Sequence, residues 1–469
     1  MSSTTECSQL VIEPSEQTER RWKLPVIYSA EISSCCAYLL FVALAFATCN
    51  SIIETSVQNK SLSDAHAVPT PPDYATSIYS LLVIVSLGVV FGYLTQLCRL
   101  PSLLGMLVVG ITLRNLPAIS DHLLVVKEWS VVLRRIAFVV ILLRGGLSLD
   151  ANAIRKLKGA CVRLALVPCS VETVVVAVAA KLIFGMDIIF GVLLGAVLAA
   201  VSPAVVIPAL LDASKAGYGV KAGVPSLVIA AASLDDVYAI SIFSLALSLL
   251  FSSGTNMEMT ILAAPVEVFS GIFFGSAMDG AGAVAVLVAA FISGHSWKKE
   301  GPLPEEDHLA NLWHLAFQPL LFGLIGFELS FDMVQSGTIF RGCLLLGIGL
   351  LFRFIASFLA VFVTTLTMRE RLFVAVAWMP KATVQAALAP VVLDMARSKD
   401  GVDSTYVDNG IVVFTIAVLS ILITAPVGAF LIRIATPLLL TRDEKSVKFT
   451  GDGENELEND MNESAENTL

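Results

Sequence analysis

The run AGVPSLVIAAASLDDVYAISIFSLALSLLF, residues 222–251, decides the fold class of this chain. It exceeds the roughly 20 apolar residues that cross the hydrocarbon core of a bilayer as a helix. Its only charged residues are the neighbours Asp235 and Asp236, close to its middle. Because a carboxylate is costly to bury in hydrocarbon, acids inside a membrane span are functional candidates. The run therefore predicts both a membrane helix and a site within it.

Runs of this kind recur along the whole chain. Of its 469 residues, 56% are hydrophobic and 15% are charged, against roughly 25% charged in a typical soluble domain. This composition predicts an all-α polytopic membrane protein with a transmembrane domain over residues 30–440. The thirteen predicted spans, of which the third is short for a full crossing, are Ala30–Ile53, Tyr74–Gln96, Pro101–Leu113, Val131–Leu149, Ala160–Phe184, Ile188–Leu211, Ala222–Phe251, Thr260–Gly275, Gly280–Gly294, Ala310–Phe327, Phe340–Thr365, Leu372–Met395 and Gly410–Leu440.

The two ends of the chain are polar. Residues 1–29 are predicted to be a cytoplasmic segment, because Arg20, Arg21 and Lys23 precede the first span and basic flanks stay inside. Residues 441–469 hold nine acids and three bases and are predicted to be a disordered acidic tail. This tail supplies −6 of the net charge of −9. The acidic balance therefore does not describe a binding surface, and nothing in the sequence indicates nucleic-acid binding.

The sequence lacks the patterns of a metal centre or an enzyme site. Its eight cysteines are scattered, mostly within apolar runs, and none has the spacing of metal ligands. No phosphate-binding glycine loop and no arrangement of a nucleophile with a base is present. We therefore expect no cofactor and no enzymatic activity.

Two predicted spans are interrupted by proline among polar residues. Ile188–Leu211 contains Val-Ser-Pro-Ala at residues 201–204, and Leu372–Met395 contains Trp-Met-Pro-Lys-Ala-Thr-Val-Gln at residues 378–385. Proline frees a backbone carbonyl upstream, which inside a membrane must face protein, water or an ion. One broken span in each half of the chain is typical of transporters with inverted repeats and a site at mid-membrane. Two simple proline kinks are the alternative.

The charged loops give a second count of the spans. With the N-terminus inside and strict alternation, the basic residues at 99, 155–158 and 215–221 fall on the cytoplasmic side, as the positive-inside rule expects. After the eighth span the agreement reverses, and those at 298–299, 369–371 and 442 fall outside. One more crossing between Phe251 and Gly294 would restore it, but that window has 44 residues and three spans need about 60. The count predicts a misassigned span or a missing helix.

The pair Asp235–Asp236 has the chemistry of an ion site. Neighbouring positions on a helix point about 100° apart, so we expect one carboxylate to bind a hard cation such as Na+ or Li+ while the other pairs with a base or carries a proton. Burial favours the protonated form of a carboxyl group, and a nearby cation favours the ionised form. Proton and metal ion then compete for one site, which is sufficient for antiport. A structural pair that bridges helices is the alternative.

Three more charged residues inside predicted spans need partners. An aspartate is the expected partner of Lys381, and a lysine that reaches the membrane surface is the alternative. Glu172 and Arg353 are expected to pair with each other, as a gate or as a scaffold, while Arg144 and Arg163 are competing partners of Glu172. No such role is expected for Glu267, Glu328 or the five histidines.

Taken together, these residues resemble the sodium/proton antiporters of the monovalent cation:proton antiporter superfamily, and among them the animal NHA branch, subfamily B of solute carrier family 9. The resemblance runs from about residue 100 to residue 442. Its most specific stretches are Leu-Gly-Ala-Val-Leu-Ala-Ala-Val-Ser-Pro-Ala-Val-Val at 194–206, Ala-Ser-Leu-Asp-Asp at 232–236, Phe-Gln-Pro-Leu-Leu-Phe-Gly at 317–323 and Ala-Trp-Met-Pro-Lys-Ala-Thr-Val-Gln-Ala at 377–386.

The resemblance implies a NhaA-like inverted-repeat fold with two crossed broken helices, and a homodimer in which a core domain moves against a dimer domain. It implies exchange of Na+ or Li+ for H+ across the lipid bilayer by alternating access. The plasma membrane is the implied location, with an intracellular vesicle or a mitochondrial membrane left open. The implied ion-binding residues are Asp235, Asp236, Ser202 and Thr383, with Lys381 as their charge partner and Glu172–Arg353 as the core ion pair.

The chain departs from this family pattern in one place. Family members carry a longer stretch where residues 271–280 follow one another here, so about one helix is expected to be absent near 275/276, through splicing or an incomplete gene model. In that case Lys381 and Arg353 are not expected to meet Asp235 and Glu172 in the usual way. Two other functions therefore stay open, a proton-coupled anion transporter and a non-transporting partner of a full-length protomer.

Overall fold

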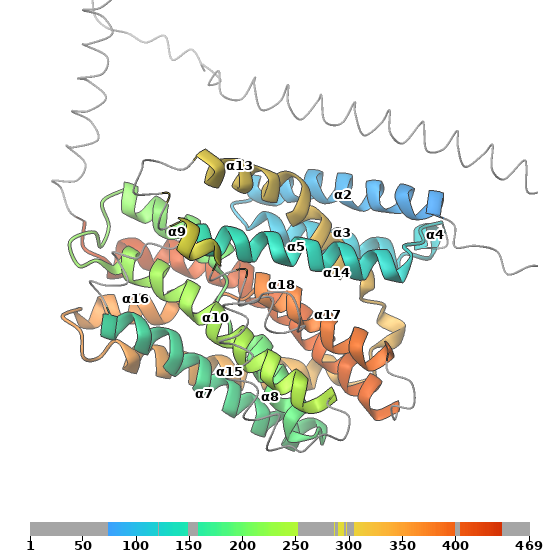
Figure 1. The fold of residues 1–469 in the computed structure, drawn as a ribbon. Helices are drawn as coiled ribbons and strands as arrows, with labels where there is room; N and C mark the ends of the chain where they lie inside the picture. The colour runs from blue at the N-terminus through green and yellow to red at the C-terminus, as the bar shows by residue number, and fades with distance from the viewer. Residues whose placement is uncertain are drawn as a thin grey trace, which may run out of the picture.

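The computed structural model describes residues 74–120, 122–148, 158–251, 286, 289–294, 297, 304–398 and 404–442, and every extended element among them is a helix (Figure 1). The predicted spans Ala30–Ile53 and Thr260–Gly275, most of Gly280–Gly294, the junction at 275/276 and residues 443–469 lie outside this described part. The helices are α2 (Tyr74–Leu97), α3 (Ser102–Asn115), α4 (Pro117–Ser120), α5 (Lys127–Ser148), α7 (Lys158–Phe184), α8 (Ile188–Ala199), α9 (Pro203–Lys215), α10 (Val224–Phe251), α13 (Pro304–Leu312), the π-helix η1 (Trp313–Phe317), α14 (Gln318–Glu328), the 3-10 helix η2 (Phe331–Met333), α15 (Thr338–Ala360), α16 (Met368–Ala377), α17 (Thr383–Ser398) and α18 (Ser404–Leu439).

Seven helical stretches in the described part are long and apolar enough to cross a membrane, and they coincide with predicted spans. The other described spans are shorter or more polar. Helix α3 has 14 residues, or about 21 Å at 1.5 Å per residue, so this span is short, as predicted. Helix α5 carries several charged residues. The membrane class is therefore confirmed, while the total of thirteen spans stays a prediction.

Both spans that contain the proline interruptions are broken where the sequence predicts. Helix α8 ends at Ala199 and α9 begins at Pro203, a residue whose fixed φ and missing N–H suit the first position of a helix. In the second half, α16 ends at Ala377 and α17 begins at Thr383, with Pro380 between them. Each break leaves a short non-helical segment, Ala200–Ser202 and Trp378–Ala382, in the interior of the protein.

The helices form two packing groups. Helices α2, α3 and α14 pack closely on one another, and a larger group contains α7 to α10 and α15 to α18, with α5 and α13 alongside α14 and η1. The small group depends on glycine. A Cβ atom on Gly110 of α3 would lie 2.2 Å from Gly323 O and 2.9 Å from Gly326 Cα of α14. Only hydrogen fits at this crossing, so the two backbones are in direct contact.

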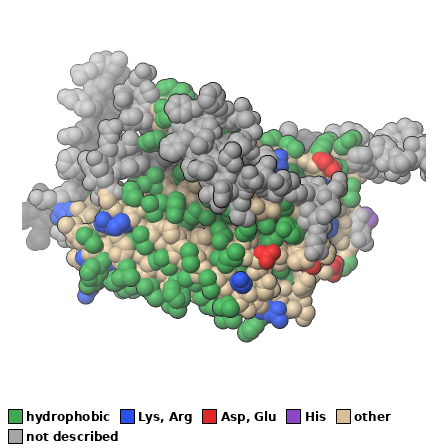
Figure 2. Space-filling view, turned by 60° about the horizontal axis from the view of Figure 1, so that its bottom comes forward, with side chains coloured by type: hydrophobic (Ala, Val, Ile, Leu, Met, Phe, Trp, Pro, Cys, Tyr) green, Lys and Arg blue, Asp and Glu red, His purple; other side chains and the backbone are tan. Residues whose placement is uncertain are grey.

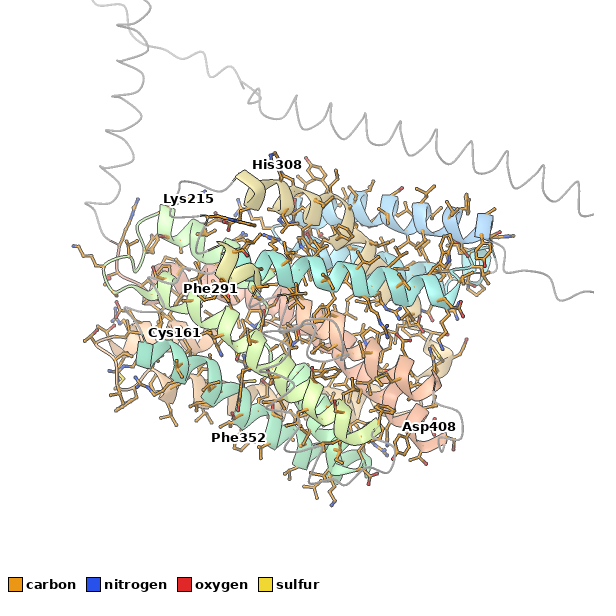
Figure 3. The ribbon with its side chains drawn as sticks, in the orientation of Figure 1. Cys161, Lys215, Phe291, His308, Phe352 and Asp408 are labelled. Atoms are coloured by element: carbon orange, nitrogen blue, oxygen red, sulfur yellow. The ribbon has the colours of Figure 1, made fainter. Side chains whose placement is uncertain are left out.

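Basic residues from both halves of the chain gather at one end of the large group. Gly219 N–H donates to Thr441 O at 2.9 Å, and the Arg442 guanidinium lies 5.9 Å from the centre of the Tyr218 ring. These contacts bring the end of α18 onto the α9–α10 loop, which follows Lys215 and carries Lys221. Figure 3 shows Lys215 and Cys161 at this end and Asp408 at the other, and Figure 2 shows several Lys and Arg side chains at this end.

Strict alternation through thirteen spans would place Arg369, Arg371 and Arg442 on the opposite side from Lys215 and Lys221, and this conflict led the sequence count to predict a misassigned span or a missing helix. The contacts of Arg442 and Thr441 with Tyr218 and Gly219 agree that strict alternation does not hold for the second half of the chain. The end of α15, which leads into Arg369 and Arg371, is instead held to the start of α7 by a hydrogen bond from Arg163 Nε to Ala360 O at 3.2 Å. The basic residues therefore share one end, as expected for a cytoplasmic face.

Candidate ion-binding site

The two broken spans cross at their non-helical segments. Ser202 N–H donates to Pro380 O at 2.9 Å, which joins the two breaks backbone to backbone. The last carbonyls of a helix have no partner within the helix, and at the end of α8 they are taken up by side chains from the second half of the chain. Gln385 Nε2 donates to Val197 O at 2.9 Å and to Ala200 O at 2.8 Å.

Two cations complete the capping of these helix ends. Lys381 Nζ donates to Leu198 O, and Arg353 Nη1 donates to Ala199 O. Arg353 also reaches the other break, where its Nε donates to Trp378 O at 2.7 Å. The carbonyl end of a helix carries partial negative charge, so positive side chains stabilise both α8 and α16 at the crossing.

The same two cations bind two buried acids. Arg353 Nη1 lies 2.8 Å from Glu172 Oε2, and Arg353 Nη2 lies 3.3 Å from Asp235 Oδ2. Lys381 Nζ lies 2.8 Å from Glu172 Oε1. All four side chains have 0% exposure, and charges so deeply buried must be paired to be tolerated. Two cations against two acids make this part of the crossing formally neutral.

Several sequence expectations can be compared with this geometry. The partner of Lys381 is Glu172 rather than an aspartate. Glu172 binds Arg353, whereas Arg163, one of the competing partners, donates instead to the backbone of α15. The expectation that a missing helix would keep Arg353 and Lys381 away from Asp235 and Glu172 is wrong, because α15 and the second break pack directly against α7, α8 and α10.

Asp235 and Asp236 lie in different surroundings. Asp235 is fully buried, and its Oδ2 accepts from Val201 N–H at 2.7 Å as well as from Arg353. Asp236 is partly exposed. The Oδ1 atoms of both carboxylates are buried and have no hydrogen-bond partner among the described residues. The two acids are thus inequivalent, as the 100° offset along α10 predicts, and Asp236 is the more accessible.

Two buried hydroxyl groups lie at the breaks themselves. Ser202 sits at the start of α9, yet its hydroxyl makes no capping bond, and its Oγ is buried without a partner in the described part of the chain. Thr383, the first residue of α17, is buried as well. Together with the carboxylate Oδ1 atoms these are oxygen donors, the ligand type that hard cations such as Na+ prefer.

Gln385 belongs to the crossing, although no role was predicted for it from the sequence. It is fully buried, it caps α8 through two hydrogen bonds, and its Oε1 has no partner among the described residues. The available signal was a lone amide inside an apolar helix directly after a break. Such a group must find partners in a membrane interior. The sequence does not show which backbone carbonyls it binds, because every residue has one.

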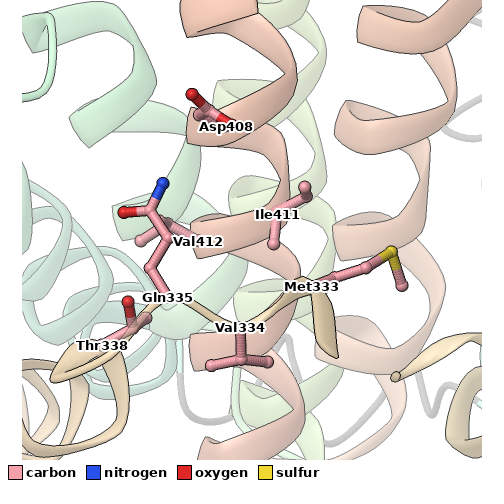
Figure 4. Close-up of a pocket in the computed structure, with 7 residues that line it drawn as sticks. All are labelled: Met333, Val334, Gln335, Thr338, Asp408, Ile411 and Val412. Atoms are coloured by element: carbon pink, nitrogen blue, oxygen red, sulfur yellow. The ribbon is translucent and has the colours of Figure 1, made fainter. Parts of the chain in front are cut away.

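Two other features lie away from the crossing. An ionic network joins the two helix groups, with Arg134 Nη2 2.7 Å from Asp394 Oδ2 and Arg397 Nη1 2.8 Å from Glu328 Oε1. Arg134 Nη1 also lies 3.5 Å from Glu328 Oε2. A small pocket between residues 333–338 and the first turns of α18 has Asp408 at its rim (Figure 4). No residue of the crossing lines it.

Known proteins resemble this chain in sequence and in fold. The family model described as sodium/hydrogen exchanger, transmembrane, matches residues 81–283 and 255–437. These two segments overlap in the region where the sequence predicts a missing helix. Sodium/hydrogen exchanger 9B2 of Xenopus tropicalis is 38% identical over 413 residues, which cover 78% of this chain and 76% of the relative. The human protein of the same name is 38% identical over 417 residues, covering 79% and 77%.

Solved structures agree on the architecture. The sodium proton antiporter MjNhaP1 from Methanocaldococcus jannaschii, solved at pH 8, superposes with a TM-score of 0.62 at 16% identity. The match covers 78% of this chain and 99% of the archaeal one. At this identity the likeness concerns the fold alone.

Proposed function

The chain belongs to the sodium/hydrogen exchanger family, and from this premise we propose that it is a secondary antiporter that exchanges Na+ or Li+ for H+ across a membrane. The observation that carries the proposal is a group of buried oxygen atoms at the crossing that have no partner among the described residues, including Oδ1 of Asp235, Oδ1 of Asp236 and Oγ of Ser202. Thr383 lies at the opposite break and completes the proposed set. A buried oxygen without a partner is costly, and a bound cation or a proton relieves that cost.

The exchange follows from competition for this site. A bound Na+ or Li+ requires ionised carboxylates, and a proton on the more accessible Asp236 displaces the cation. In the proposed mechanism Asp235 stays ionised, since Arg353 and Val201 N–H both favour its negative charge. Glu172 and Arg353 hold the crossing together, and Lys381 supplies the charge partner. No cofactor is required, because the transported ions are the only non-protein components.

Alternating access requires two bodies that move against each other. We propose that the large helix group is the core domain and that α2, α3 and α14 belong to the dimer domain of a homodimer. We also propose that the two broken spans belong to a pair of inverted repeats within each chain. The chain then has a cytoplasmic segment at 1–29, a transmembrane domain at 30–440 and a tail from 441. The apolar helices support a multi-pass membrane protein, with the plasma membrane as the proposed location.

Purified protein in liposomes tests the proposal. A preset pH gradient is expected to dissipate when Na+ or Li+ is added, and Asp235→Asn combined with Asp236→Asn is expected to abolish the response. A lumenal pH dye measures both, and a protonophore control shows that the vesicles are sealed. Full activity in the double variant, or no cation response in the native protein, would reject antiport at this site.

Neither alternative function has an observation in its favour. An anion transporter needs basic groups free to meet its substrate, whereas Arg353 and Lys381 are bound to acids and to helix carbonyls. A non-transporting partner was suggested by a crossing that could not assemble. The crossing is assembled in this structure, with both halves of the chain contributing charges.

A further inference from the structure

Gln385 presents an amide whose orientation is fixed by its own hydrogen bonds. Its Nε2 donates to two backbone carbonyls, Val197 O at 2.9 Å and Ala200 O at 2.8 Å. Because both acceptors are oxygen atoms, the amide can only face them with its nitrogen. The side chain is fully buried.

One of these carbonyls belongs to the peptide group that binds Asp235. The Ala200 C=O and the Val201 N–H are the two ends of a single planar peptide bond. The oxygen end accepts from Gln385 at 2.8 Å, and the nitrogen end donates to Asp235 Oδ2 at 2.7 Å. Hydrogen bonds arranged in series through a low-dielectric interior polarise one another. Gln385 and Asp235 are therefore coupled through one peptide group.

No helix holds that peptide group in place. Ala200 is extended, with φ −69° and ψ 137°, and it lies in the break between α8 and α9. A peptide in such a segment can tilt unless a side chain or another backbone group restrains it. The Gln385 amide supplies this restraint at the carbonyl end.

We infer that Gln385 is a positioning residue for Asp235, acting through the Ala200–Val201 peptide group. It keeps the Val201 N–H directed at Asp235 Oδ2 and so fixes where the carboxylate presents its Oδ1 atom. The inference rests on the proposed exchange, because it concerns how well Asp235 is placed to bind Na+. Without the amide the peptide tilts, Asp235 binds Na+ less tightly, and a proton on Asp236 displaces the cation more readily.

Two substitutions test the role of the donor. Gln385→Met keeps the length of the side chain and removes both N–H donors, while Gln385→Glu, which is neutral when buried beside carbonyl oxygens, keeps one O–H donor. We expect Gln385→Met to shift the pH profile of Na+-driven exchange in liposomes toward higher pH and Gln385→Glu to shift it less. At fixed pH, the Na+ concentration for half-maximal exchange should rise about threefold to tenfold, the effect expected of one weakened hydrogen bond to a charged group.

Asn115 provides a matched control. Its Nδ2 also donates to two backbone carbonyls, Ile111 O and Leu329 O, both at 2.8 Å, and none of its contacts reaches the crossing. Asn115→Leu should lower the melting temperature without moving the pH profile. If Gln385→Met does not give folded protein, Gln385→Asn, which keeps the amide on a shorter side chain, carries the same expectation.

The outcomes distinguish this inference from the proposed function. If the native protein exchanges Na+ but Gln385→Met keeps the native pH profile and Na+ requirement, the positioning role is wrong. A shift in Gln385→Glu as large as that in Gln385→Met would show that the donor to Ala200 O is not what matters and would also overturn the inference. If the native protein neither exchanges Na+ nor is stabilised by Na+ against thermal unfolding, the proposed function fails first.

Discussion

Two helix crossings in this protein bring backbones together in opposite ways. At the α3–α14 crossing both helices are continuous, so their peptide groups are satisfied internally, and close approach requires only the absence of side chains at Gly110 and Gly326. At the crossing of the broken spans the helices stop, and their exposed carbonyls must be satisfied by Gln385, Arg353 and Lys381. The first crossing depends on the absence of side chains, and the second depends on charged and polar side chains that cap the helix ends.

The difference shows why one crossing can carry function and the other cannot. At the glycine contact the backbones meet through hydrogen atoms and through peptide groups already bonded within their helices. The broken crossing needs cations to cap its helix ends and acids to pair with those cations, and the Oδ1 atoms of Asp235 and Asp236 have no partner among the described residues. A site for a hard cation thus follows from the way in which the break itself is stabilised.

Removing the central acid tests the charged crossing and should have the largest effect. Glu172→Gln leaves Arg353 and Lys381 buried against Asp235 alone, and breaking a buried pair of this kind costs about 3–5 kcal/mol. Thermal unfolding in detergent should show a large loss of stability. A second substitution, Lys381→Met, should restore part of that loss, because it removes the unpaired cation.

Glu128→Gln serves as the control for this experiment, since Glu128 is exposed at the start of α5. It should leave the melting temperature nearly unchanged. Equal stability losses in Glu172→Gln and Glu128→Gln would contradict the view that charge pairing holds the broken crossing together.

Adding one methyl group tests the glycine crossing. The Cβ atom of Gly110→Ala would lie 2.2 Å from Gly323 O and 2.8 Å from Phe327 N. Both are backbone atoms that cannot rotate away, and overpacking of this kind costs about 1–3 kcal/mol. Gly347→Ala in α15 is the matched control, because nothing lies within 4 Å of its added Cβ atom. If both variants have the same melting temperature, close backbone contact is not what stabilises the packing of α3 on α14.

The ionic network between the two helix groups should show the smallest effect. Glu328 is 18% exposed and Arg397 is 21% exposed, and partly solvated pairs contribute about 0–1 kcal/mol. Glu328→Gln should therefore lower stability slightly, and the difference should shrink further as salt screens the charges. A loss of stability as large as that of Glu172→Gln would show that this network contributes as much as the buried ion pairs of the crossing, and would contradict the prediction.

Much of the fold could be predicted from local signals. Both helix breaks were predicted from Pro203 and Pro380, which stand among polar residues within apolar runs. Proline breaks a helix locally, because it lacks a backbone N–H and clashes with the preceding turn. Asp235 and Asp236 were evident because two adjacent acids conflict with a membrane interior. Glu172 and Arg353 were expected to pair because each is the kind of residue that needs a partner there.

Predictions that depended on distant parts of the chain were less successful. Lys381 was expected to meet an aspartate, but its distance from Glu172 is set by how α7, α8 and α17 pack, which no local pattern encodes. Gln385 was seen among the polar residues of the second break but was assigned no role, because its partners are backbone carbonyls and every residue has one. The charge count indicated a misassigned span or a missing helix, but it could not say which, because a single error in the count reverses the side of every later loop.

The sequence by itself determined that this is a helical membrane protein with two broken spans and a pair of acids inside a third. These properties follow from the cost of placing polar groups in hydrocarbon, which each residue incurs wherever its helix packs. The tertiary structure decided which cation meets which acid, and it joined Gln385 to Asp235 through one peptide group. Those assignments depend on distances of about 3 Å between residues more than a hundred positions apart, and only the packing of the helices sets such distances.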